Sequence, residues 1–144
     1  MKPKLGLISI LILILGISPQ LSAALGHIDS VSFDSLRYKP GDQGKCALTI
    51  SDPFSDTTVK ITKVELRFDF GTTIWTGELI INPGETKVLE IIFTIPESTA
   101  DGDYTFSVYF EFYKREVTRS GEEKWRWVSP GSYGPFGEKI AVRK

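Results

Sequence analysis

The sequence predicts an all-β protein, an antiparallel sandwich of seven to eight strands that follows an N-terminal signal segment. Three observations support this prediction. Helix signals are nearly absent after residue 24, strand signals recur about every 10 to 15 residues, and Gly, Pro, Asp and Asn lie between them. Short strands at this spacing, joined by turns, are typical of β-sandwiches.

The first 24 residues have the organisation of a secretory signal. Lys2 and Lys4 give a basic start, an almost purely apolar run covers residues 5–17, and residues 22–24 supply the small side chains of a cleavage site. The apolar run is shorter than the roughly 20 residues that span a bilayer. We expect cleavage after residue 24, which leaves a domain of residues 25–144. An uncleaved anchor is the alternative, and both interpretations place the domain in the secreted or cell-surface compartment.

Alternation of apolar residues places each strand. In the third strand, the apolar residues from Val64 to Phe70 alternate with charged ones, the pattern of a sheet with one buried face. Val59 and Ile61 are out of phase with that set, which predicts a bulge near residues 62–63. Residues 114–124 are predicted to form a polar hairpin tip. The strands are expected at about residues 28–36, 45–50, 59–70, 73–81, 86–95, 104–113 and from 125, the last resuming over 137–143.

The single cysteine and the single histidine limit the chemistry. Cys46 alternates in phase with Leu48 and Ile50, so we expect a buried core residue, and it has no partner for an intramolecular disulfide. His27 lies near the mature N-terminus, before the predicted core, which disfavours a Ser/His/Asp or Cys/His set. We therefore expect no catalytic residue, no enzyme activity and no cofactor.

The charge balance excludes one class of partner. The chain carries a net charge of −1, and loss of Lys2 and Lys4 with the signal would make the domain more acidic. Binding to phosphates needs a basic face. We expect no nucleic-acid partner, and a membrane contact only if the N-terminal segment stays uncleaved.

Four turn motifs carry a resemblance to a known group. They are Lys-Pro-Gly-Asp at 39–42, Asn-Pro-Gly-Glu-Thr at 82–86, Ile-Pro-Glu-Ser-Thr at 95–99 and Gly-Asp-Tyr at 102–104. Over residues 28–113 the sequence is similar to immunoglobulin-like modules of secreted prokaryotic proteins, such as the cell-adhesion-related CARDB type. Those modules often have Asn after the second strand, where this chain has Ser51 and Asp52.

The resemblance implies an immunoglobulin-like sandwich that acts as a spacer, an adhesion module or an accessory domain. It also implies a structural role for Tyr104, which resembles the tyrosine corner of such sandwiches, a hydroxyl that bonds back to nearby backbone.

Aromatic residues near the C-terminus form the first candidate binding site. Tyr109 and Tyr113 alternate opposite to the apolar set of their strand and should point outward, while Trp125 and Trp127 share one face of the next strand. Exposed Tyr and Trp on paired strands could form a flat platform for a sugar or a protein. The alternative interpretation is that the two tryptophans cover the open core or pack under the loop over residues 129–136.

Two further candidate sites would hold metals. If cleavage follows residue 24, the mature chain begins Leu-Gly-His, and His27 with the free amine and two amides could form a square-planar Cu(II) or Ni(II) site. Asp52 and Asp56 lie in one loop and Asp101 and Asp103 in another. If these loops met at one end of the sandwich, their oxygens could bind Ca²⁺. The alternative is that the acids serve their own turns.

These features together predict a non-enzymatic domain for binding or assembly at the cell surface. A carbohydrate-binding module that uses the Tyr/Trp face and an exported metal-binding protein are the alternatives. The partner is a cell-surface protein or a polysaccharide in these interpretations. Exposed sheet edges would also allow assembly by strand addition.

Overall fold

The computed structural model describes residues 27–52, 54, 56–134 and 139–144, so the expected signal over residues 1–24 lies outside the described residues. Regular structure within these ranges consists of strands, which confirms the all-β prediction. In chain order the strands are β1 (His27–Phe33), β2 (Arg37–Tyr38), β3 (Gln43–Ser51), β4 (Val59–Phe68), β5 (Gly71–Ile81), β6 (Thr86–Thr94), β7 (Gly102–Tyr104), β8 (Phe106–Val117), β9 (Glu123–Tyr133) and β10 (Ile140–Val142).

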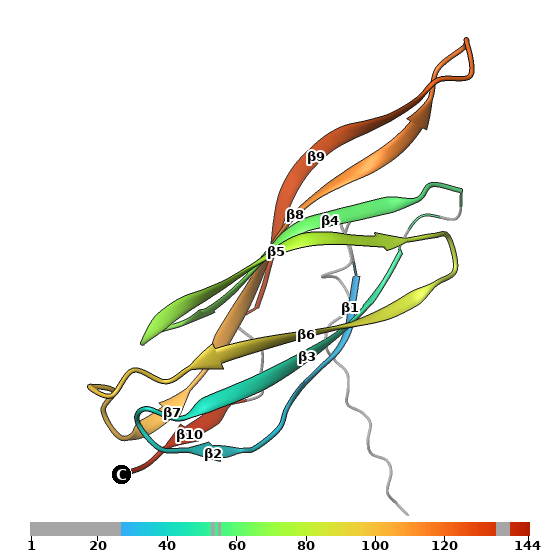
Figure 1. The fold of residues 1–144 in the computed structure, drawn as a ribbon. Coiled ribbons are helices and arrows are strands. Elements are labelled where there is room, and N and C mark those ends of the chain that lie inside the picture. Colours follow the sequence, from blue (N-terminus) through green and yellow to red (C-terminus); the bar gives the residue numbers. More distant parts are fainter. Residues whose placement is uncertain (1–26, 53, 55, 135–138) are drawn as a thin grey trace, which may run out of the picture.

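The strands form two facing sheets and a small third one (Figure 1). The sheet β1-β3-β6 packs against the sheet β5-β4-β8-β9, and the sheet β2-β10-β7 lies at one end. Both larger sheets are antiparallel, as predicted, whereas β10 pairs in parallel with β2. The long strands match the expected ones. The short strands β2, β7 and β10 arise where the chain seals the end of the core.

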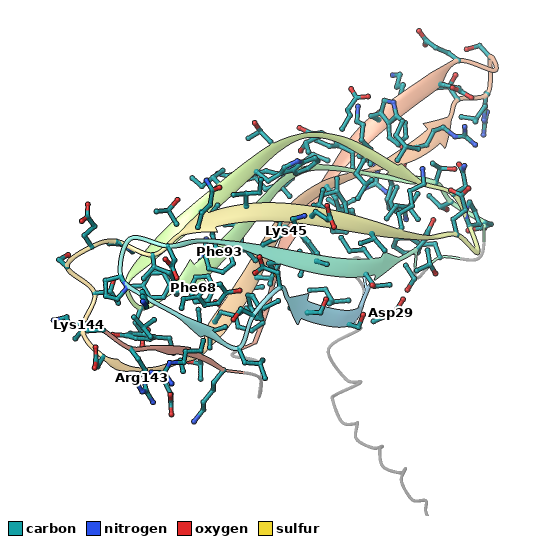
Figure 2. The ribbon with its side chains drawn as sticks, turned by 60° about the horizontal axis from the view of Figure 1, so that its bottom comes forward. Asp29, Lys45, Phe68, Phe93, Arg143 and Lys144 are labelled. Carbon is teal, nitrogen blue, oxygen red and sulfur yellow. The ribbon has the colours of Figure 1, made fainter. Side chains whose placement is uncertain are left out.

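Alternating side chains of the two sheets build the core. On β3 the buried residues include Cys46, as expected, with Leu48 and Ile50 in phase. Phe93 of β6 faces Phe68 of β4 across the sandwich, with ring centroids 5.3 Å apart (Figure 2). Each large side chain removed from water contributes on the order of 2 kcal/mol, so this interdigitated layer is the main stabilising feature.

Two local predictions from the sequence are confirmed. The register of β4 shifts between Ile61 and Lys63 against both neighbouring strands, which is the expected bulge. It brings Val59 and Ile61 to the core side together with Val64, although their spacing is out of phase. The hydroxyl of Tyr104 donates a 2.7 Å hydrogen bond to the carbonyl oxygen of Ala100, which is the tyrosine-corner contact.

The β8–β9 hairpin extends beyond the sandwich as an arm. The last residue of β8 that pairs with β4 is Lys114, opposite Val59, and the pairing with β9 continues to Val117 opposite Glu123. Figure 1 shows the two strands leaving the body of the molecule together. The expectation of a polar tip over residues 114–124 is therefore corrected, because cross-strand pairs extend the ladder and leave only residues 118–122 as the tip. We call residues 115–125 the arm.

Candidate functional site: the outer face of the four-stranded sheet

The predicted aromatic residues gather on the outer face of the sheet β5-β4-β8-β9. Alternation puts Phe110 and Phe112 of β8 into the core, so Tyr109 and Tyr113 point away from it. Because directly paired residues share a face of a sheet, Trp127 lies on that side opposite Tyr113. Trp125, two residues before Trp127 in β9, lies on the same face, opposite Arg115. The expected outward direction of Tyr109 and Tyr113 and the expected shared face of the two tryptophans are confirmed, and the tryptophans do not cover the core. The loop over residues 129–136, under which the alternative would pack them, lies partly outside the described residues.

The cationic side chain of Lys60, from β4, lies over two of these rings. Lys60 pairs with Tyr113 across the strands, and its Nζ lies 5.5 Å from the Tyr113 ring centroid and 4.6 Å from that of Trp125. The side chain of Lys60 is only 16% exposed, so its charge is held against the rings rather than in bulk water. A cation within about 6 Å of an aromatic centroid contributes about 0.5–1 kcal/mol or more when it is partly desolvated.

A second cluster surrounds Tyr109 further along the same face. The guanidinium carbon of Arg67 lies 4.5 Å from the Tyr109 ring centroid, and the Nζ of Lys63 lies 5.9 Å from it. Glu65 forms ion pairs with both cations, at 2.7 Å to Arg67 and 3.0 Å to Lys63. The hydroxyl of Tyr109 donates a 2.9 Å hydrogen bond to Glu111.

The ion pairs shift the protonation equilibria of this cluster. The hydrogen bond from Lys63, followed by that from Arg67, lowers the pKa of the Glu65 carboxyl. The same contact with Glu65 raises the pKa of Lys63, and the hydrogen bond to Glu111 raises the pKa of Tyr109. Glu65, Lys63 and Tyr109 therefore keep their neutral-pH charge states, and the cluster is a network of opposite charges around one ring.

The flat aromatic platform expected from the sequence is thus only partly open. Tyr109, Tyr113 and Trp125 are partly buried and carry cations against their rings. Trp127 is 51% exposed and lies where the arm joins the body. Val117, on the same face of the arm, is 62% exposed. The accessible part of the site is therefore Trp127 with the arm.

Sequence reasoning missed the three cations of β4. The alternation from Val64 to Phe70 already placed Arg67 outward, and the outward direction of Lys60 and Lys63 could have been derived in the same way. Their position beside the aromatic rings could not, because it depends on the register between β4 and β8, strands separated by about forty residues of chain.

The structure keeps the two acidic loops apart. Asp52 and Asp56 follow the end of β3 at Ser51, which pairs with Thr86, whereas the other acids lie near the opposite end, where Gln43 pairs with Thr94. Figure 2 shows these two ends: Asp29, which accepts a hydrogen bond from Ser51, marks one, and the C-terminal residues mark the other. The described residues contain no group of three potential metal ligands. The condition for a shared Ca²⁺ site is therefore not met.

Each acid of the second loop has a structural contact. Asp103 forms a 2.9 Å ion pair with Arg143, and Asp101 accepts a hydrogen bond from the backbone N–H of Lys144. Both contacts fasten the C-terminus to the loop before β8. These acids hold the chain end through contacts between residues 40 and 43 positions apart in the sequence, so in these contacts they do not serve their own turns.

The first loop, in contrast, uses its acids locally, as the alternative predicts. Asp52 accepts a 2.8 Å hydrogen bond from the N–H of Phe54, an Asx turn, and burial raises the pKa of its carboxyl. Asp56 accepts a hydrogen bond from the hydroxyl of Thr57. The backbone of His27 pairs with Ser51 at the start of β1, while its imidazole and the two residues before it lie outside the described part.

The thiol of Cys46 is buried in the core. Burial raises its pKa to about 12, so the group stays protonated at neutral pH. A protonated and inaccessible thiol is a poor nucleophile and a poor metal ligand. The residue packs as a small apolar side chain.

Comparisons with known proteins add only distant structural likenesses. No protein-family model matches the chain, and no curated protein matches it. Among solved structures, Spo0M, a sporulation control protein from Bacillus subtilis, is similar with a TM-score of 0.47 and 17% identity over 83% of this chain. The match covers 49% of the Spo0M chain, so this chain spans about half the length of that protein. A likeness of this strength carries no information about function.

One further property of the described ranges concerns membranes. Within them there is no helix with the length and apolar character needed to cross a bilayer.

Proposed function

We propose that this chain is a non-enzymatic binding or assembly domain, secreted or held at the cell surface, that contacts a protein partner through Trp127 and the arm. The observation that carries the proposal is the half-exposed tryptophan at the base of a projecting hairpin. Tryptophan is the residue most often found as an energetic anchor in protein interfaces.

The composition of this surface favours a protein partner. Around Trp127 the outer face presents Arg115 and Val117 on the arm, with the Tyr113 ring beside the tryptophan. Tyr, Trp and Arg are the residues enriched in interface centres. The cation–π contacts made by Lys60 hold the base of the arm in place, so the surface is organised before binding and loses little conformational entropy when it binds.

Two observations support a role without catalysis. The buried, protonated Cys46 offers no accessible nucleophile. The charged groups around Tyr109 are paired with one another, and the pKa values of Lys63 and Glu65 move away from neutrality rather than toward it. General acid–base catalysis uses groups whose pKa lies near the working pH.

Carbohydrate recognition is the second candidate. Trp127 and Tyr113 are directly paired across two strands, an arrangement on which a sugar ring could stack. Because Lys60 covers Tyr113 and Trp125, a sugar would contact mainly Trp127. A single exposed ring favours a weak contact over an extended polysaccharide platform.

The proposed location rests on the signal-like N-terminus and on the resemblance to immunoglobulin-like modules of secreted proteins. The sandwich and the Tyr104 corner agree with that resemblance. Intact-mass analysis of the exported protein tests the location. A chain that begins at residue 25 supports it, and a full-length chain that stays in the cytoplasm contradicts it.

Site-specific photocrosslinking in the exporting host tests the binding surface. A benzophenone amino acid at position 123, on the arm, should form an adduct with the partner. Trp127→Ala should reduce that adduct by roughly thirtyfold, the effect of losing an anchor of about 2 kcal/mol. Ile92→Ala, on the outer face of the other sheet and 57% exposed, is the matched control and should leave the adduct unchanged.

The chemistry of the adduct separates the candidates. An adduct in which mass spectrometry identifies peptides of a second protein supports a protein partner, and one whose added mass is removed by glycosidases supports the carbohydrate alternative. Equal adducts in the presence and absence of Trp127 would contradict both, since both place the contact on this tryptophan.

A further inference from the structure

The edge strand β5 has few of the features that usually prevent strands from pairing with other chains, although its pairing with β4 shifts register opposite residues 77–78. Within the described part of the chain it is hydrogen-bonded on one side only, to β4. Eleven residues form it, Gly71–Ile81, and Glu78 is their only charged residue, with no proline. An exposed sheet edge presents a row of free N–H and C=O groups, and a long apolar edge is a template for a further strand.

The other edge of the same sheet is protected by contrast. Strand β9 carries Lys124 and Arg126 and contains Pro130, which lacks an N–H group. Each edge strand has one register shift against its neighbour, so the charges and the proline are what distinguish β9 from β5. Charges, proline and bulges are the devices by which proteins block edge pairing. Strand addition is therefore expected at β5 rather than at β9.

The sequence of β5 is complementary to itself in one antiparallel register. About a two-fold axis at Gly77, Ile74 of one copy lies opposite Ile80 of the other, and Thr76 lies opposite Glu78. Ile74 and Ile80 both project from the outer face and are 56% and 36% exposed. Cross-strand apolar pairs of this kind stabilise a sheet by about 0.2–1 kcal/mol each. The register brings no two like charges together.

The inner face of β5 fits the same register. Trp75 and Leu79 are partly buried against the core and would lie opposite each other across the axis. A Cβ atom at Gly77 would lie 2.8 Å from the Trp75 ring, so the indole occupies the space that a side chain there would need. The glycine therefore leaves the point on the axis free of side chains.

Strand β6, an edge strand of the facing sheet, has a similar spacing of exposed apolar residues but is not complementary to itself. It also exposes two aliphatic residues, Val88 and Ile92, at 60% and 57%. The register that would pair them across a two-fold axis places Glu90 opposite Glu90 of the second copy. Like charges directly opposite each other destabilise strand pairing. The same apolar spacing is thus blocked on β6 and open on β5.

We infer that two copies of this chain associate through antiparallel pairing of their β5 strands about Gly77, which joins the two four-stranded sheets into one continuous sheet. The interface is isologous, so it closes at the dimer. Trp127 lies on the opposite edge strand of the sheet and stays free in the dimer. The inference is therefore independent of the proposed function, and the dimer would present two copies of the Trp127 surface to a multivalent partner.

Sedimentation analysis of the full chain tests the association. Because the interface is small, we expect a reversible monomer–dimer equilibrium with half-dimerisation on the order of 100 μM. Ile74→Lys with Ile80→Lys places lysines opposite each other in this register and should leave only monomer over the same range.

Charge exchange in the same positions tests the register. Ile74→Lys with Ile80→Glu places opposite charges across the axis and should restore the dimer. Within each chain the lysine introduced at position 74 lies beside Glu65 and the glutamate introduced at position 80 lies beside Lys60, so the fold is not disturbed. Ile92→Lys on β6 is the control and should dimerise like the wild type, and the denaturation midpoint of each variant checks that it is folded.

Three results would overturn the inference. A wild-type chain that is monomeric at all concentrations excludes the dimer. Open polymers without a dimer plateau show pairing between unlike edges. Two double variants with the same behaviour show that Ile74 and Ile80 are not opposite each other.

Discussion

Strand β8 belongs to two regions that are stabilised in different ways. From Phe106 to Phe112 its alternate side chains are fully buried between the sheets. From Arg115 to Val117 the same strand forms half of the arm, and its side chains are exposed. The body is thus stabilised by burial of apolar surface, whereas the arm is held by charges and rings at its base.

The comparison teaches what keeps a two-stranded hairpin ordered outside a core. An isolated two-stranded hairpin is marginally stable in water. Here Lys60 of the body lies between the Tyr113 and Trp125 rings, at the point where the arm leaves the sheet. Further out, cross-strand ion pairs such as Arg126 with Glu116 add only screened, exposed interactions. The arm is therefore fastened at its base and loosens toward its tip.

The largest expected effect comes from the core half of β8. Phe110→Ala removes a fully buried ring and should lower the free energy of unfolding by about 3–5 kcal/mol, because the cavity cannot collapse between two sheets. Denaturant unfolding measures the loss, with Phe110→Leu as a milder control. A loss below about 1 kcal/mol would mean that burial is not what stabilises the body.

The next effect concerns Asp34, a carboxylate that is hydrogen-bonded to a buried residue of the body. Asp34 accepts hydrogen bonds from the hydroxyl of the buried Tyr38 and from the N–H of Lys45. Both bonds lower the pKa of the Asp34 carboxyl, and the bond from Tyr38 has the larger effect. A carboxyl with a lowered folded-state pKa stabilises the fold above its unfolded pKa of about 3.9, and this stabilisation is lost as the pH falls through the folded-state pKa.

Asp34→Asn should therefore reduce the loss of stability in acid, below about pH 4, by at most about 1 kcal/mol because solvent screens the exposed carboxyl. Thermal unfolding from pH 7 to pH 2 measures it. Asp56→Asn, at an acid that accepts a hydrogen bond from the neighbouring Thr57, is the control. Parallel acid profiles of wild type and Asp34→Asn would contradict the prediction.

A smaller and local effect is expected at the base of the arm. Lys60→Met keeps the apolar stem and removes the charge over the Tyr113 and Trp125 rings, at a cost of about 0.5–1 kcal/mol. Hydrogen exchange should become faster in the arm and stay unchanged in the amides of β3. Lys45→Met is the matched control, because Lys45 is 48% exposed and forms an ion pair with Glu90 within the sheet β1-β3-β6, away from the arm. Equal exchange in the arm of both variants would show that the cation does not fasten it.

The smallest effect is expected in the outer arm. Glu116→Gln breaks the cross-strand ion pair with Arg126, whose two side chains are 45% and 58% exposed. Exposed pairs contribute about 0.2–1 kcal/mol and are screened by salt, so the unfolding midpoint should change little and not at all at high salt. A large, salt-resistant loss would show that the arm is stabilised by more than its base.

Much of the fold could be predicted from local patterns. Alternation from Val64 to Phe70 identified a strand and its buried face, and the break in phase at Val59 and Ile61 identified the bulge. Turn residues such as those at 82–86 marked where strands begin. These features depend on residues close together in the chain, where backbone sterics and side-chain direction decide the structure.

The candidate site could be predicted only in part. The outward direction of Tyr109 and Tyr113 follows from alternation, and so does the shared face of the two tryptophans. The cations over their rings could not be foreseen, because Lys60 reaches Tyr113 only through the pairing of β4 with β8. The length of the arm was also missed, since a run of charged residues forms a tip or a ladder depending on cross-strand pairs.

The sequence by itself determined the strands, their buried faces and the core position of Cys46, because each follows from short-range alternation and turn chemistry, while the Tyr104 corner was implied by the resemblance to immunoglobulin-like modules. Only the tertiary structure decided which side chains from distant strands meet. It separated the acids at 52 and 56 from those at 101 and 103, and it left β5 as an open edge. The reason is physical: register and strand order are set by burying the core as a whole, and no single segment contains that information.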